Sequence, residues 1–200
     1  MTTVDLLLQR ARSMLRRSTV YWPGAGETRP GALSAARLLN VVEAWRELDA
    51  QQQAELRPLA EAAGLDVDDP SLAVPACDCS GFVCWALGVP RQISPPDPVL
   101  GEWLFTDSIH ADATHGGRRF ERLREAVVGC LVVYPKPVDE PFGHIGIVTA
   151  VEAGEALRIV HCSAGNFKTA PFDAIKENAG EAFAQHPESV YAWCRDVRPA

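Results

Sequence analysis

The chain has 200 residues, of which 47% are apolar and 22% charged, the composition of an ordinary globular domain with its own core. Its net charge of −7 argues against a nucleic-acid-binding protein, because such proteins usually carry a basic patch. No apolar run is long enough to span a bilayer, and no signal peptide is visible at the start. We therefore expect a protein made in the cytoplasm, without a membrane span and without export by the general route.

The first half of the chain is predicted to be mainly helical. Residues 3–17 carry apolar side chains at helical spacing, and residues 33–48 and 50–63 repeat that pattern after a turn-rich loop. Asp49 begins the third of these helices with a capping-box sequence, and Gly64 ends it. We expect the second and third helices to form an inserted helical hairpin at about 33–63.

The second half is predicted to contain an antiparallel sheet. A short helix from Cys79 to Leu87 precedes it. Strand-like runs then follow at 130–134, 144–151, 157–162 and 191–197, separated by turn residues. Helices first and strands later indicate a single α+β domain over residues 1–200, with the Cys79 helix packed on the sheet.

Cys79 is the candidate nucleophile. Asp78 is a good N-cap, which puts Cys79 in the first turn of a helix, where the dipole and free N–H groups favour a thiolate and stabilise an oxyanion. The alternative is a buried structural thiol, which is how we interpret the other five cysteines. Without matching ligand pairs, no metal site is expected.

His144 and His161 are the candidate base and its orienting partner. A hairpin centred between Ala153 and Gly154 pairs residues whose numbers sum to 307, so Gly146 faces His161. Because side chains alternate along a strand, both histidines then project from one face as diagonal neighbours. We expect His144 to take the thiol proton and His161 to fix its ring orientation and tautomer.

These motifs resemble the NlpC-type cell-wall cysteine peptidases and their CHAP relatives. The matching segments are D-C-S-G-F-V at 78–83, H-I-G-I at 144–147 and V-H-C-S at 160–163. The resemblance implies a papain-like fold, thiol-dependent cleavage of peptidoglycan stem peptides or of the sugar–peptide amide, and no cofactor. It also implies that Tyr21, Asp78 and Ser80 lie on the substrate side of the site.

The chain departs from that family in three places. About fifty residues separate the Tyr21 loop from Cys79, the loop itself is altered, and Cys130 stands where the family has an aspartate. We expect the inserted hairpin to pack beside the groove and narrow access to it.

The substrate and the route to it remain open at this point. Peptidoglycan lies outside the cytoplasm, so a cell-wall enzyme without a signal needs specialised secretion or phage lysis, with a delivery or immunity protein as partner. One alternative is an amidase or acyltransferase that acts on a small cytoplasmic amide. Another is a non-catalytic binding module that keeps the groove.

Overall fold

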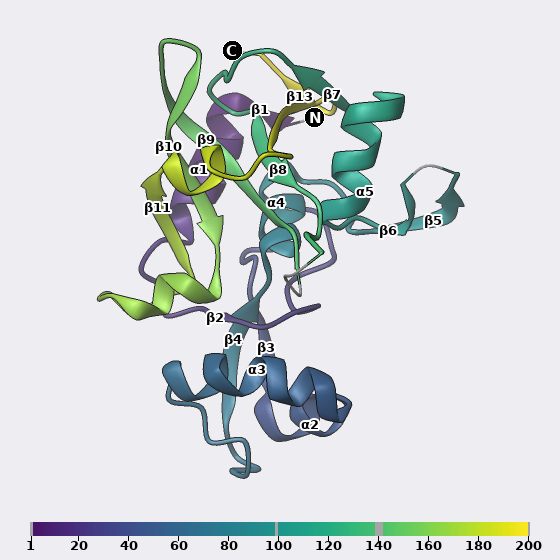
Figure 1. Ribbon diagram of the computed structural model, residues 1–200. Helices are drawn as coiled ribbons and strands as arrows, with labels where there is room; N and C mark the ends of the chain where they lie inside the picture. Colours follow the sequence, from purple (N-terminus) through teal and green to yellow (C-terminus); the bar gives the residue numbers. More distant parts are fainter. Residues whose placement is uncertain (1, 99, 139–141, 200) are drawn as a thin grey trace.

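A six-stranded antiparallel sheet is the centre of the molecule (Figure 1). The computed structural model describes residues 2–98, 100–138 and 142–199. The strand order is β11-β10-β9-β8-β12-β7. The strands are β7 (Phe120–Leu123), β8 (Leu131–Tyr134), β9 (His144–Glu152), β10 (Glu155–Cys162), β11 (Ile175–Ala179) and β12 (Val190–Cys194). Together with the helices described below, this sheet confirms the α+β class.

The β9–β10 hairpin has the register expected from the sequence. Gly146 pairs with His161, and the turn residues Ala153 and Gly154 both have positive φ, 50° and 82°. A β-bulge near Arg158 shifts the pairing close to the turn, but the register is regained at Ile159. The hairpin therefore places His144 and His161 on the same face of the sheet.

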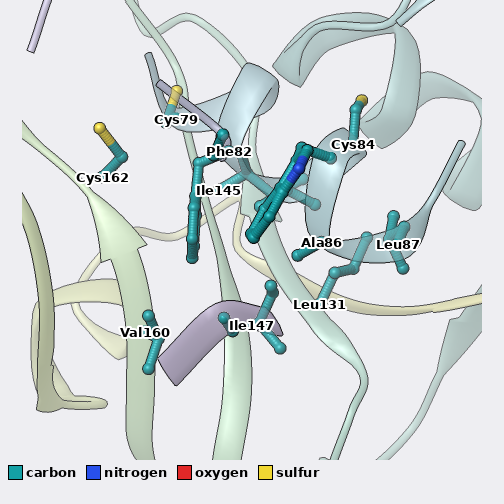
Figure 2. Packing of buried hydrophobic residues seen from close by; sticks show 14 of the residues in the cluster. Cys79, Phe82, Cys84, Ala86, Leu87, Leu131, Ile145, Ile147, Val160 and Cys162 are labelled. Atoms are coloured by element: carbon teal, nitrogen blue, oxygen red, sulfur yellow. The ribbon is translucent and has the colours of Figure 1, made fainter. Parts of the chain in front are cut away.

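The larger core lies between the sheet and two helices. Helix α4 (Cys79–Leu87) packs on β9 and β10, and α1 (Val4–Ser13) packs on α4. Ile145, Ile147 and Val160 point from the sheet toward α4, where Phe82 meets them (Figure 2). All residues of α4 are buried, so the helix is fixed along its whole length.

A smaller cluster covers the opposite face of the sheet. Its buried members include Val148, Ile159 and Phe183, the last from the short helix α6 (Glu181–Ala184). His144 and His161 belong to this face, because they lie on the same side of their strands as Val148 and Ile159.

The prediction of a helix over 33–48 is wrong in its first half. Residues 37–40 form strand β3 (Arg37–Asn40), which pairs with β4 (Ala73–Cys77), and only α2 (Val41–Arg46) is helical. Helix α3 (Ala50–Ala62) has the predicted capping box. The insert is therefore a strand followed by two helices, not a helical hairpin.

The insert has its own small core. Strand β2 (Val20–Tyr21) pairs in parallel with β4, which gives a three-stranded sheet in the order β2-β4-β3. Trp22 and Trp45 meet edge to face at 6.4 Å and pack with residues of α3. In Figure 1, α2 and α3 lie beyond this small sheet, at the end of the molecule away from β7.

The remaining elements are short. They are β1 (Thr2–Thr3) and β13 (Val197–Arg198), which pair in parallel, the β5 (Gln92–Asp97) and β6 (Gly101–Trp103) pair, α5 (Thr106–Ala111), a π-helical turn at Asp112–Gly116 and a 3₁₀ turn at Ala164–Lys168. None of the helices in the described ranges has the length and apolar character needed to cross a membrane.

Candidate functional site

Cys79 is the first residue of α4, as predicted. The side chain of Asp78 caps the helix, with Oδ1 accepting a hydrogen bond from the Gly81 N–H at 2.6 Å. At the other end, Gly88 has a φ of 72°, the left-handed conformation that ends helices. Cys79 as a whole is only 5% exposed, so the nucleophile candidate is held rigidly and largely shielded from water.

Asp78 and Ser80 form part of the wall around Cys79. Asp78 Oδ2 accepts from the Gly24 N–H at 2.8 Å and forms a buried ion pair with Arg91. Arg91 Nη2 also donates to Ser80 Oγ at 3.0 Å, and Ser80 donates to Asp78 Oδ1. Both predicted substrate-side residues are therefore engaged in hydrogen bonds within the protein.

Arg91 was not predicted as a site residue. Its side chain is 3% exposed, and Nη1 donates to the Ala25 carbonyl at 2.9 Å, which ties the 22–26 loop to the segment after α4. Nothing in the sequence distinguishes it from the scattered surface arginines, because its role depends on a carboxylate thirteen positions earlier.

A cleft of about 300 Å³ opens beside Cys79. Tyr21, which the resemblance implies to be on the substrate side, lines this cleft next to the thiol. The lining residues are Tyr21, Pro23, Gly24, Asp78, Cys79, Ser80, Arg91, Phe105, Thr106, Asp107, Lys136, Phe142 and Gly143. Burial raises the pKa of the Tyr21 phenol well above its usual value, and the neighbouring Cys79 and Asp78 raise it further. Tyr21 is thus a neutral hydroxyl beside the sulfur.

The insert borders a second cleft of about 400 Å³. This cleft lies between the 22–26 loop and α2, and Pro23 and Gly24 line both clefts. The insert therefore lines a neighbouring cleft, and no described residue of 33–63 lines the Cys79 cleft itself. Whether it narrows access for a substrate stays a prediction.

The environment of Cys79 opposes ionisation. Burial is the largest cause that raises the pKa of the Cys79 thiol, and the charge of Asp78 raises it further. The Ser80 N–H and Arg91 act in the opposite direction but do not compensate. The expectation that the helix start lowers this pKa is therefore wrong for the structure as it stands, because desolvation outweighs the helix dipole.

His144 and His161 are hydrogen-bonded to each other, as predicted. His144 Nε2 and His161 Nδ1 are 2.7 Å apart. Burial lowers the pKa of both histidines, that of His161 to about 4 and that of His144 well below its usual value, with His161 a second cause for His144. Both imidazoles are therefore neutral at neutral pH.

The structure brings Cys79 and the histidine pair to neighbouring but separate environments. Cys79 belongs to the cluster on the α4 face, whereas His144 stacks on Phe183 at 5.0 Å on the opposite face. Gly143, which directly precedes His144, lines the Cys79 cleft. Among the described residues, no hydrogen bond joins Cys79 to His144, and His144 Nδ1 has no partner.

Several residues around the histidines were missed from the sequence. Asn178 Nδ2 lies 3.0 Å from His161 Nε2, and Asn166 Oδ1 lies 2.7 Å from the same amide nitrogen. Tyr134 packs against His144 from the paired strand. Strand β11 brings Asn178 beside His161 through a pairing that the sequence pattern did not indicate.

No family model and no curated protein matches the chain. One solved structure, the crystal structure of Ly7917, is similar at 15% identity with a TM-score of 0.39. The match covers 96% of this chain, which spans 63% of the length of that one.

Proposed function

We propose that the chain is a cysteine-dependent amide hydrolase that resembles the NlpC-type peptidases and cleaves peptidoglycan stem peptides. The observation that carries the proposal is the cleft in which Cys79 begins a helix beside Tyr21, and whose lining includes Gly143, the residue directly before His144 and β9. The 2.7 Å bond between His144 and His161 supports a base with an orienting partner.

The proposed reaction follows from these positions. His144 takes the Cys79 proton, and the sulfur attacks the amide carbonyl to give a tetrahedral intermediate. The first N–H groups of α4 face the oxyanion, and the proton on His144 then passes to the leaving amine. Water releases the acyl group by the reverse sequence and restores the thiol. Exposed Lys136 at the cleft matches the carboxylates of stem peptides.

The test is Cys79→Ala in an assay with purified peptidoglycan or a synthetic stem tetrapeptide, with products identified by mass. Removal of the nucleophile should lower the rate by several orders of magnitude, on the order of 10⁴-fold or more. Cys84→Ala is the matched control, because it removes another buried thiol from the same helix.

Equal rates for Cys79→Ala and the wild type would contradict the assignment of the nucleophile. A wild type that leaves stem peptides intact, but whose Cys79 is alkylated rapidly at neutral pH, would place the activity on a small amide instead.

A binding module with the same cleft is the second candidate. Two observations favour it: burial raises the pKa of Cys79, and Asp78 and Ser80 already have protein partners. Cys79 that stays unreactive toward iodoacetamide at pH 7 in the folded protein, together with peptide binding and no cleavage, would establish this function over hydrolysis.

A further inference from the structure

Two asparagines continue the hydrogen-bonded chain behind the histidine pair. Asn178, on β11, contacts His161 through its amide nitrogen, and Asn166, in the 3₁₀ turn, contacts Asn178. Asn166 is 6% exposed, and its Nδ2 lies 2.7 Å from the Ala174 carbonyl oxygen and 3.4 Å from the His161 carbonyl oxygen. The series of hydrogen bonds thus begins at these backbone carbonyls and ends at His144.

The backbone carbonyl of Ala174 fixes which group donates and which accepts in each hydrogen bond of this series. A backbone carbonyl only accepts, so the Asn166 atom beside Ala174 has to be the amide nitrogen, and its other atom has to be the oxygen. That oxygen in turn requires a donor, so the Asn178 atom 2.7 Å away is also an amide nitrogen. The same nitrogen lies 3.0 Å from His161 Nε2, which therefore has to accept.

The histidine tautomers follow in the same way. A neutral imidazole has one N–H, so His161, whose Nε2 accepts, carries its proton on Nδ1 and donates it to His144 Nε2. His144 then carries its own proton on Nδ1. That nitrogen has no hydrogen-bond partner among the described residues, so under the proposed function it is the atom that would take the Cys79 proton. In this tautomer it has no lone pair with which to do so.

We infer that Asn178, held by Asn166, is a positioning residue that keeps the proton of His144 on Nδ1 and so holds the pair in a form that cannot accept the Cys79 proton. The role toward Cys79 rests on the proposed function, whereas the tautomers of the two histidines can be measured whether or not the protein is a hydrolase. An imidazolium at His144 is opposed in the same way, because its Nε2–H would meet the Nδ1–H of His161.

Activation then requires Asn178 to turn away from His161. One proton moves along the hydrogen bond from His161 Nδ1 to His144 Nε2. A second leaves His144 Nδ1 for water, and a third is taken from water by His161 Nε2, so the number of protons on the pair does not change. Asn178 is partly exposed at its site on β11, which allows water to replace its amide.

The test is long-range ¹⁵N–¹H correlation spectroscopy of the histidine rings in the full chain at pH 7, which identifies the protonated nitrogen of each ring. The wild type should show Nδ1–H for both His144 and His161. Asn178→Asp replaces the donor by a carboxylate that accepts, so both rings should switch to Nε2–H. Alkylation of Cys79 by iodoacetamide should then accelerate about tenfold or more, since His144 Nδ1 is free to accept its proton.

Two further variants complete the experiment. Asn178→Ala should give mixed tautomers, and it serves if the aspartate variant does not fold. Asn40→Asp, the same change at the cap of α2, should leave both rings as in the wild type. A wild-type His161 protonated on Nε2, or tautomers unchanged in both folded Asn178 variants, overturns the inference. Loss of hydrolysis in Cys79→Ala tests the proposed function separately.

Discussion

At the scale of single residues, Gly146 shows why the H-I-G-I sequence suits this site. A methyl group at this position would lie 2.5 Å from Ile159 Cγ2, 3.1 Å from His161 Cβ and 3.2 Å from Phe183 Cζ. The glycine is needed for space, since its φ is not in the left-handed region. It lets Phe183 lie flat against His144, with an angle of 17° between the ring planes.

Gly146→Ala should therefore push Phe183 and His161 away from His144. We expect the free energy of unfolding to fall by about 1–3 kcal/mol, as in other overpacked sites. Because a small misplacement of a reacting group is costly, hydrolysis should fall about a hundredfold. Urea unfolding and the peptide assay measure the two effects.

Gly165→Ala is the matched control, because its methyl group would meet only Ser163 Oγ, at 3.5 Å. This variant should keep both stability and activity. Equal behaviour of the two alanine variants would contradict the steric role of Gly146.

At the scale of elements, the start of α4 depends on a buried ion pair as much as on helix propensity. Asp78 is at once the N-cap, the partner of Arg91 and an acceptor for the Gly24 N–H. Arg91 also lies over the Trp103 ring at 5.1 Å, and its Nε has no partner within the described residues. Loss of the carboxylate would leave a buried guanidinium without its counter-charge.

Asp78→Asn should destabilise the fold strongly although asparagine is an equally good N-cap. We expect a loss of about 3–5 kcal/mol, the usual effect of removing one partner of a buried ion pair. Asp49→Asn makes the same change at the exposed cap of α3 and should cost less than about 0.5 kcal/mol. Denaturant unfolding midpoints measure the stability that each variant loses. Losses of similar size in the two variants would contradict the role of the ion pair.

Local signals explain which elements were predictable. Helices α3 and α4 carry their caps in adjacent residues, and the β9–β10 register is set by one turn and strict alternation, so short-range rules suffice. Strand β3 has no such signal, because it is a strand only by pairing with β4, whose residues lie between thirty-three (Asn40 with Ala73) and thirty-nine (Arg37 with Ala76) positions further on. Arg91 and Asn178 act on residues that are likewise distant in sequence.

At the scale of the whole molecule, the two buried histidines link stability to pH. The pKa of both is lowered in the folded chain, whereas an unfolded histidine titrates near 6.5. Between about pH 4 and 6.5 the unfolded chain therefore binds more protons than the folded one. Stability has to rise with pH across this window, so it is lost as the pH falls from 6.5 toward 4.

His161→Gln should reduce this dependence. Each such histidine contributes a slope of up to about 1.4 kcal/mol per pH unit, so the variant should have the flatter plot of unfolding free energy against pH between 4.5 and 6.5. Urea titrations at several pH values measure it, with His115→Gln as the control at an exposed position. Parallel plots for wild type and His161→Gln would contradict burial of a neutral His161.

The strand order of the central sheet bears on how the chain is made. Strand β7 joins the sheet only through β12, which inserts between β7 and β8. During vectorial synthesis on a ribosome, β7 and the open edge of β8 are therefore complete well before their shared partner emerges. Until then both present unpaired backbone groups, which invite association with other nascent chains. These strand edges stay unpaired until residues 190–194 leave the exit tunnel. Slower translation upstream of these residues therefore lengthens the time during which β7 and β8 can associate with other nascent chains.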